Sequence, residues 1–147
     1  MHSPTGVADK PRVVLDTNAA LDWMVFLNAN MQPWANAIAK GRVQWILSQR
    51  MRDELEHMAA HQSLSCWQPD TAAIGHRIAT LGVVVVANAS ALVDRLRCTD
   101  ADDQVFIDVA LQHRARWLLT HDKALLKLAR RSAVHGLRIC RPADATP

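Results

Sequence analysis

Tyrosine is absent from this sequence of 147 residues and phenylalanine occurs only twice, so five tryptophans make up most of its aromatic content. No aromatic stacking platform is therefore visible. Glycine is also scarce, and its five residues are too few and too scattered for a P-loop or a Gly-rich dinucleotide-binding fingerprint. The sequence also lacks a serine nucleophile elbow, so these three enzyme motifs are excluded.

Cysteines and apolar runs are limited as well. The three cysteines, Cys66, Cys98 and Cys140, are odd in number and widely spaced, and they match neither a disulfide framework nor a zinc motif. Apolar runs such as residues 81–87 are far too short to span a bilayer. Residues 1–10 lack the basic and apolar stretches of a signal peptide. Together these features predict reduced thiols in a cytoplasmic protein.

The overall composition is that of an ordinary globular domain. Half of the residues are hydrophobic and 21% are charged, and 147 residues suit one domain with one core. We expect a flexible N-terminal segment over residues 1–10, one domain over residues 11–142 and a short tail over residues 143–147.

Short apolar runs alternate with helical patterns along the chain. The runs predict strands over residues 12–16, 43–47, 83–86, 116–120 and 137–140. Apolar spacing and capping residues predict helices over residues 19–28, 32–40, 49–61, 69–81, 89–97, 101–114 and 123–131. This alternation predicts a parallel sheet of about five strands that is covered on both faces. The all-valine run at 83–86 suits a strand buried on both faces of such a sheet.

Positive charge is concentrated in the second half of the chain. The net charge is +3, and residues 95–141 contain ten Lys or Arg and five Asp. Because several of these Asp occupy positions typical of a site, the remaining surface of this half is basic. Basic surface beside an acidic cluster suits an enzyme that acts on a polyanion through a metal ion. The alternative interpretation is a solvated helix face.

Acidic residues follow two of the predicted strands. In open parallel sheets the active crevice lies beyond the carboxyl ends of the strands. Asp16 comes directly after three apolar residues, and Asp122 comes two residues after the fourth strand. A charge in such a place lies at a sheet end or is buried at considerable cost. For both residues, capping of the next helix is the alternative explanation.

Helical periodicity indicates two further acids. Glu54 lies on the flank of the apolar stripe of its predicted helix and is the acid of that helix that faces inward. Asp103 lies within the wide apolar arc of a later helix, whereas Asp108 lies outside this arc. Asp102 is also within the arc and is a possible substitute for Asp103. Asp100 has the position of a helix cap.

These four acids are expected at one edge of the sheet, where they would repel one another. Like charges a few ångströms apart raise each other's pKa and destabilise the fold unless a cation neutralises them. Oxygen ligands without His or Cys suit Mg²⁺ or Mn²⁺ better than zinc. One such ion, or two, can activate water and stabilise the leaving oxygen in a phosphoryl displacement.

The order and spacing of four segments resemble the PIN domain family over residues 12–142. These segments are Asp16-Thr17-Asn18 after the first strand, the inward-facing Glu54, Asp102-Asp103 at a helix start, and Leu119-Thr120-His121-Asp122 after the fourth strand. The resemblance implies a three-layer α/β/α sandwich with the activity of a metal-dependent ribonuclease. It is nearest to the stand-alone bacterial members described as toxins of toxin–antitoxin pairs, which implies a homodimer that an antitoxin protein blocks.

The resemblance also implies roles for individual residues. The metal-binding acids would be Asp16, Glu54, Asp103 and Asp122. Polar side chains would orient these acids or the attacking water, namely Thr17, Asn18 and Thr120. Because Asp102 and Asp103 are adjacent, either could be the third acid, and the helical arc favours Asp103.

Other interpretations have less support from the sequence. His57 and His61 have a metal-binding spacing, but the zincin pattern needs Glu directly after the first His, and a solvated helix face explains them better. His121, beside the acids, could contact a phosphate. A haloacid-dehalogenase-like phosphatase needs a second Asp where Asn18 stands. A non-catalytic PIN scaffold that binds RNA or protein, and a nuclease that cuts DNA, both remain open.

Overall fold

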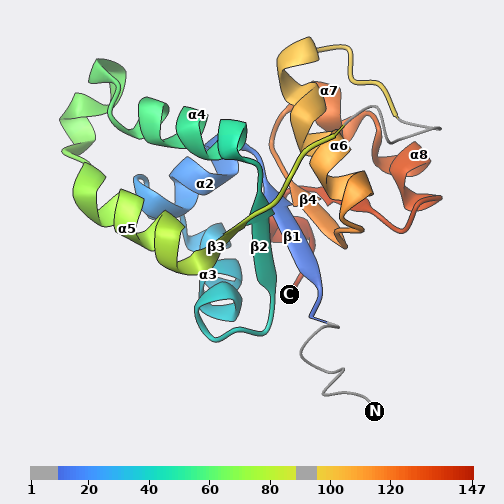
Figure 1. Cartoon of the computed structure of the whole chain (residues 1–147), viewed down its shortest axis with the longest axis horizontal. Coiled ribbons are helices and arrows are strands. Elements are labelled where there is room, and N and C mark those ends of the chain that lie inside the picture. Colours follow the sequence, from blue (N-terminus) through green and yellow to red (C-terminus); the bar gives the residue numbers. More distant parts are fainter. Residues whose placement is uncertain (1–9, 89–95) are drawn as a thin grey trace.

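A five-stranded parallel sheet forms the centre of the protein in a computed structural model that describes residues 10–88 and 96–147 (Figure 1). The strands are β1 (Arg12–Leu15), β2 (Gln44–Leu47), β3 (Gly82–Val84), β4 (Trp117–Leu119) and β5 (Arg138–Cys140). Their spatial order is β3-β2-β1-β4-β5, and every neighbouring pair is parallel. The predicted parallel sheet of five strands is therefore confirmed.

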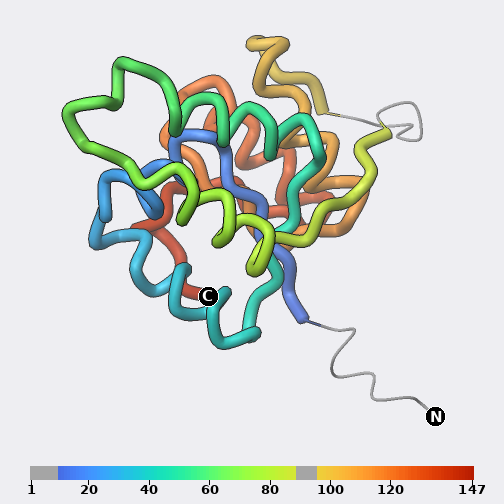
Figure 2. The backbone as a smooth tube through the Cα atoms, turned by 60° about the vertical axis from the view of Figure 1, so that its left-hand side comes forward, coloured from blue at the N-terminus to red at the C-terminus, as the bar shows by residue number. Residues whose placement is uncertain are grey.

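Helices cover both faces of this sheet. One side carries α2 (Thr17–Met24), α3 (Gln32–Ala39), α4 (Gln49–Ala59) and α5 (Thr71–Leu81) (Figure 1). The other side carries α6 (Gln104–Gln112), α7 (Lys123–Leu126) and α8 (Ala129–Ala133). Figure 2, with the first side turned forward, shows α4 and α5 (green) in front of the strands. The three-layer α/β/α arrangement follows from these positions.

Short 3₁₀ turns account for most of the remaining regular structure. They are η1 (Ala29–Met31), η2 (Gln62–Trp67), η4 (Ala101–Asp103) and η5 (Pro142–Asp144). The helix predicted over residues 101–114 begins as η4 before it continues as α6, and the helix predicted over 123–131 is divided into α7 and α8. Most of the helix predicted over residues 89–97 lies outside the described residues. None of the helices in residues 10–88 and 96–147 is both long and apolar enough to cross a membrane.

Strand β1 lies in the middle of the sheet, where it is paired on both sides, and its apolar side chains suit this position. Val13 and Val14 are completely buried, and Val13 lies opposite Trp45 of β2 and Trp117 of β4. Strands enclosed by neighbours and by helices on both faces are typically continuous hydrophobic runs. The predicted strand at residues 12–16 has this composition, and Asp16 directly follows the observed strand.

The prediction that the valine run at residues 83–86 is buried on both faces was wrong. β3 is an edge strand paired only with β2, and Val83 and Val84 are 39% and 43% exposed. Val86, beyond the end of the strand, is 75% exposed. The composition of the run identified a strand, but its place in the strand order decided its exposure.

Tryptophans hold the helical layer of α2 and α3 against the sheet. The Trp23 ring meets Trp45 edge to face with centroids 5.2 Å apart, and Trp34 meets Trp117 in the same way at 5.0 Å. The indole of Trp34 also donates a hydrogen bond to the carbonyl of Pro142, 3.0 Å away. Such aromatic pairs stabilise a core beyond the area that they bury. They connect α3 to β4 and to the C-terminal η5.

We expect opposite effects of alanine at two glycines. A Cβ at Gly82, where α5 turns into β3, would lie 2.8 Å from the Ile78 carbonyl oxygen and 3.0 Å from Leu47 Cδ2. Gly82→Ala should therefore lower the free energy of unfolding by about 1–3 kcal/mol, as overpacking does. Gly75 has open space in the middle of α5, and Gly75→Ala should raise this free energy by about 0.5–1 kcal/mol. Urea denaturation measures both, and equal effects would contradict the packing argument.

Candidate metal centre

The sheet has a topological switch point between β1 and β4, because strands are added on opposite sides of this pair. From β1 the chain adds β2 and β3 on one side, whereas β4 and β5 extend the sheet on the other side. The two halves meet where the Asp16 amide donates to the Leu119 carbonyl at 3.2 Å. Connections that leave such a switch point toward opposite faces open a crevice beyond the strand ends. The candidate carboxylates of the site gather at this crevice.

Asp16 is held rigidly at the end of β1. Its side chain is 4% exposed, one carboxylate oxygen accepts from the Ala19 amide at 2.8 Å, and the other accepts from the Thr120 hydroxyl. Asp16 is thus the N-cap of α2. Burial raises the pKa of Asp16, while the hydrogen bonds from Thr120 and Ala19 oppose this rise. The capping explanation for Asp16 is correct, and it applies together with a position at the crevice.

Thr120 joins the two aspartate motifs. Its side chain is completely buried, and its hydroxyl oxygen accepts from the Asp122 amide at 2.9 Å while donating to Asp16. Asp122 in turn caps α7 by accepting from the Ala124 amide at 2.7 Å. One hydroxyl therefore sets the position of the loop after β4 relative to the end of β1.

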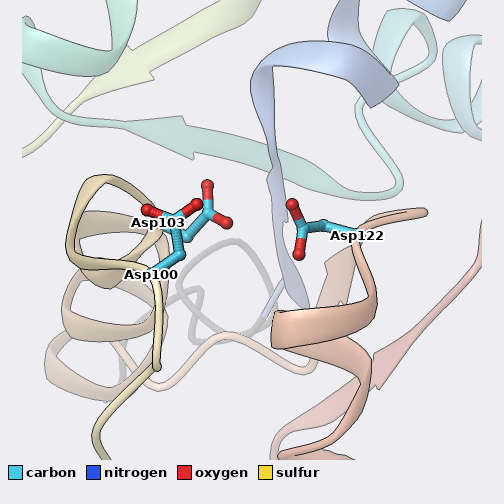
Figure 3. Close-up of side chains that lie close together, drawn as sticks. All are labelled: Asp100, Asp103 and Asp122. Carbon is cyan, nitrogen blue, oxygen red and sulfur yellow. The ribbon is translucent and has the colours of Figure 1, made fainter.

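Three carboxylates converge in front of this junction (Figure 3). Asp100 and Asp103 come from η4, and Asp122 reaches toward them from the start of α7. One oxygen from each lies within 4.8 Å of the others. The pKa of Asp103 is raised from 3.8 to about 7, first by burial, then by the charge of Asp122 and a side-chain hydrogen bond with it, and last by the charges of Asp100 and Asp16.

The chemistry of this triad (Asp100, Asp103 and Asp122) fits a divalent cation. Oδ2 of Asp103 is buried and accepts no hydrogen bond from the residues that the structure describes. A buried carboxylate oxygen without a donor is costly, and a cation would satisfy it and relieve the repulsion among the three acids. Oxygen ligands of this kind suit Mg²⁺ or Mn²⁺.

A cleft of about 190 Å³ contains most of the residues expected at the site. Its lining includes all four predicted acids and three of the other candidates: Asp16, Glu54, Asp103, Asp122, Thr17, Asn18 and Asp102. Thr120 acts through Asp16 instead. Glu54 comes from α4, and its side chain is exposed. The structure thus brings the predicted residues together, while their catalytic roles remain predictions.

A family model described as a PIN domain matches residues 12–124. The chain belongs to the PIN domain family. This match runs from β1 to the start of α7 and includes every acid of the cleft and the triad. PIN domains are a nuclease family, so the metal-compatible geometry agrees with the family. Comparisons with curated proteins and with solved structures gave no match.

The sequence assigned Asp100 to capping alone. In this PIN domain Asp100 does cap η4, accepting from the Asp102 amide at 3.0 Å, and it also belongs to the triad. Its spacing of three residues from Asp103 was the available signal, because residues three apart share a face of a helical turn. Asp102 is exposed and lines the cleft outside the triad.

Gln104 ties the triad segment to α6. Its side-chain oxygen accepts from the Cys98 amide at 2.7 Å, and its side-chain nitrogen donates to the Leu96 carbonyl at 2.6 Å and to Asp108 at 3.0 Å. Asp108 is 5% exposed, although it lies outside the apolar arc of the predicted helix. The segment before Asp100 covers α6, and a helical wheel contains no information about such a cover.

The three candidate histidines have contacts with residues outside the triad. His121 is exposed and its Nε2 is 3.4 Å from Asp22 Oδ2, so an acid already lies beside the residue considered for a phosphate contact. His57 and His61 are exposed, and their ring centroids are 6.2 Å apart. The Nδ1 of His61 accepts from the Ser63 amide and caps η2. The three cysteines are free thiols.

We expect the Thr120 hydroxyl to be essential for stability. Thr120→Val should lower the free energy of unfolding by about 1–3 kcal/mol, because it leaves a buried Asp16 oxygen without its donor. Thr120→Ser retains the hydroxyl and should cost less than the valine variant. Urea denaturation of both variants at pH 7 measures this difference. Equal losses would show that the methyl group, and not the hydrogen bond, matters.

The raised pKa of Asp103 predicts a pH-dependent cost in the metal-free protein. The protonated form is favoured in the folded state, so its contribution to stability is complete below pH 3.8 and is lost as the pH rises through about 7. Asp103→Asn should remove this dependence and be more stable than the wild type at pH 8. Because Asp103 is only partly buried, we expect the free energy of unfolding of the variant to exceed that of the wild type at pH 8 by about 1 kcal/mol. Thermal unfolding in EDTA from pH 5 to 8 tests this, and parallel curves would contradict it.

Proposed function

We propose that this PIN domain is a metal-dependent endoribonuclease. The observation that carries the proposal is the triad of Asp100, Asp103 and Asp122 with an unpartnered, buried Asp103 oxygen at the switch point of the sheet. Membership of a nuclease family supports the same reaction class. A cation would offset the repulsion within this cluster of acids and would supply the charge that phosphoryl chemistry uses.

The acids of the site would have two roles, metal binding and proton transfer. Asp100, Asp103 and Asp122 would hold Mg²⁺ or Mn²⁺, and Asp16 would join them through oxygen lone pairs that its two hydrogen bonds leave free. When bound, the cation would supply Lewis-acid charge to the phosphate and a more acidic water. Glu54, exposed on α4 at the same cleft, would accept a proton from the attacking water.

Thr17 and Asn18 would orient the water or the phosphate. Both follow Asp16 at the start of α2 and line the cleft. Thr120 would act beneath them by holding the carboxylate of Asp16. Asp102, exposed at the same cleft, would stay outside the first set of ligands, because the triad already contains Asp103.

The charge of the surface favours a polyanionic substrate. All the described Lys and Arg from residue 97 onward are exposed: Arg97, Arg114, Arg116, Lys123, Lys127, Arg130, Arg131, Arg138 and Arg141. Contacts from such side chains to phosphates bind a nucleic-acid backbone without reading its sequence. RNA is the proposed substrate because of the resemblance to bacterial toxins. The same resemblance supports a homodimer and an antitoxin protein as partner. The few, widely spaced cysteines support action in the cytoplasm.

The decisive test is metal-dependent cleavage. Total bacterial RNA incubated with the protein and Mg²⁺ or Mn²⁺ should be cut at discrete sites, and EDTA should stop the cutting. Asp103→Asn and Asp122→Asn should lower the rate about 100-fold or more, since even groups that support metal ligands cost 10–100-fold. Asp53→Asn is the matched control, because Asp53 is exposed on α4 and, among residues 10–88 and 96–147, accepts only from Gln49.

Each result of this test has a distinct meaning. Equal cutting by all variants would identify a contaminating nuclease and contradict the proposal. Cleavage confined to DNA of the same sequence would replace the substrate while keeping the metal chemistry. RNA binding without any cleavage would favour the alternative of a PIN scaffold.

A further inference from the structure

A second, larger cleft lies beside the acidic cleft. It has a volume of about 660 Å³ and lies between the start of α4, the start of α6 and the extended residues that follow β3. Its lining includes Arg50, Val84–Val86, Ala101, Gln104 and Asp108. This volume is within the range of about 300–1,000 Å³ that small-ligand sites have. None of the roles described above uses this space.

The two clefts share two of their walls. On α4, Arg50 lines the larger cleft and Glu54 lines the acidic cleft, and residues four apart lie on one face of a helix. In η4 and at the start of α6, Ala101 and Gln104 line the larger cleft, while Asp102 and Asp103 of η4 line the acidic one. A chain that crosses the acidic cleft along α4 therefore reaches the larger cleft within about one helical turn, ~5.4 Å.

The lining of the larger cleft has the two parts that a nucleotide needs. Arg50 is exposed, and its guanidinium has no ion-pair or hydrogen-bond partner among residues 10–88 and 96–147. By contrast, Arg52 on the same helix pairs with Glu56 at 2.9 Å. Val84 and Val86 present apolar surface, 43% and 75% exposed. An unpaired guanidinium suits a phosphate, and an apolar wall suits a base or a ribose.

The remaining polar groups restrict what can bind. Asp108 is buried and already accepts a hydrogen bond from the side-chain nitrogen of Gln104 at 3.0 Å, so we assign it no contact with a bound nucleotide. The side-chain amide of Gln104 is already bonded to Cys98, Leu96 and Asp108, so it is not free to read a base edge. The phosphate therefore belongs near Arg50 at the exposed side, and the base contacts are apolar and tolerant of sequence.

We infer that the larger cleft binds the nucleotide next to the scissile phosphate of a single-stranded RNA, with its phosphate on Arg50 and its base or ribose against Val84–Val86. This inference rests on the proposed nuclease function. The two clefts then form one continuous binding surface. The acids perform the chemistry, and Val84–Val86 position the RNA.

Binding of a fluorescent 12-nucleotide RNA, followed by anisotropy in Mg²⁺, tests the assignment. All proteins carry Asp122→Asn so that the RNA stays intact. Adding Arg50→Gln should weaken binding about tenfold, as expected for one lost charge-assisted contact. It should also reduce the slope of log K against log salt by about 0.7, one phosphate contact on a single strand. Arg52→Gln, which removes the same charge two residues away, should change Kd less than twofold.

A second pair of variants tests the apolar wall. Val86→Asp should weaken binding about tenfold by placing a charge beside the bound nucleotide, whereas Val134→Asp adds the same charge at a valine that is 85% exposed elsewhere. Arg50, Val86 and Val134 are exposed, and Arg52 forms a surface ion pair with Glu56. The four variants should therefore keep the thermal unfolding midpoint of their parent. Equal effects within both pairs would overturn the subsite while leaving the nuclease proposal intact. Failure of the parent protein to bind RNA at any salt concentration would overturn both.

Discussion

The parallel pairing of β1 with β4 is the constraint on which the site depends. Because the sheet grows away from this pair in both directions, the connections after β1 and β4 leave toward opposite faces and a crevice opens between them. Asp16 and Asp122 stand at the two sides of this crevice, and the Thr120 hydroxyl contacts both residues. A PIN domain with these two strands apart could not bring its acids together, whatever their identity.

The protein holds together carboxylates that repel one another, and the surrounding hydrogen bonds explain how. Asp16 is fixed by Ala19 and Thr120, and the segment before Asp100 is fixed by Gln104. These contacts hold the acids in place against their mutual repulsion, which together with burial, the larger cause, raises the pKa of Asp103 to about 7. Such preorganisation costs stability in the absence of a cation, and the same cost makes a cation bind favourably.

The edge position of β3 connects the fold to the proposed binding surface. An edge strand leaves one side unpaired, and here the valines after and within β3 remain partly exposed beside the acidic cleft. In a central strand the same valines would be buried in the core and the larger cleft would not exist. Exposed apolar surface next to a charged site is a common feature of ligand-binding surfaces.

The sequence by itself determined the strands, the approximate helices, and the placement of Asp16 and Asp122 after strands and of Asp103 at a helix start, because apolar runs and capping residues act locally. Only the tertiary structure decided that Asp100 joins the triad, that Asp108 is buried, and that the valine strand lies at an edge. These three features depend on which distant segments become neighbours. Neighbours in space follow from strand order and packing, and a local pattern of residues does not contain them.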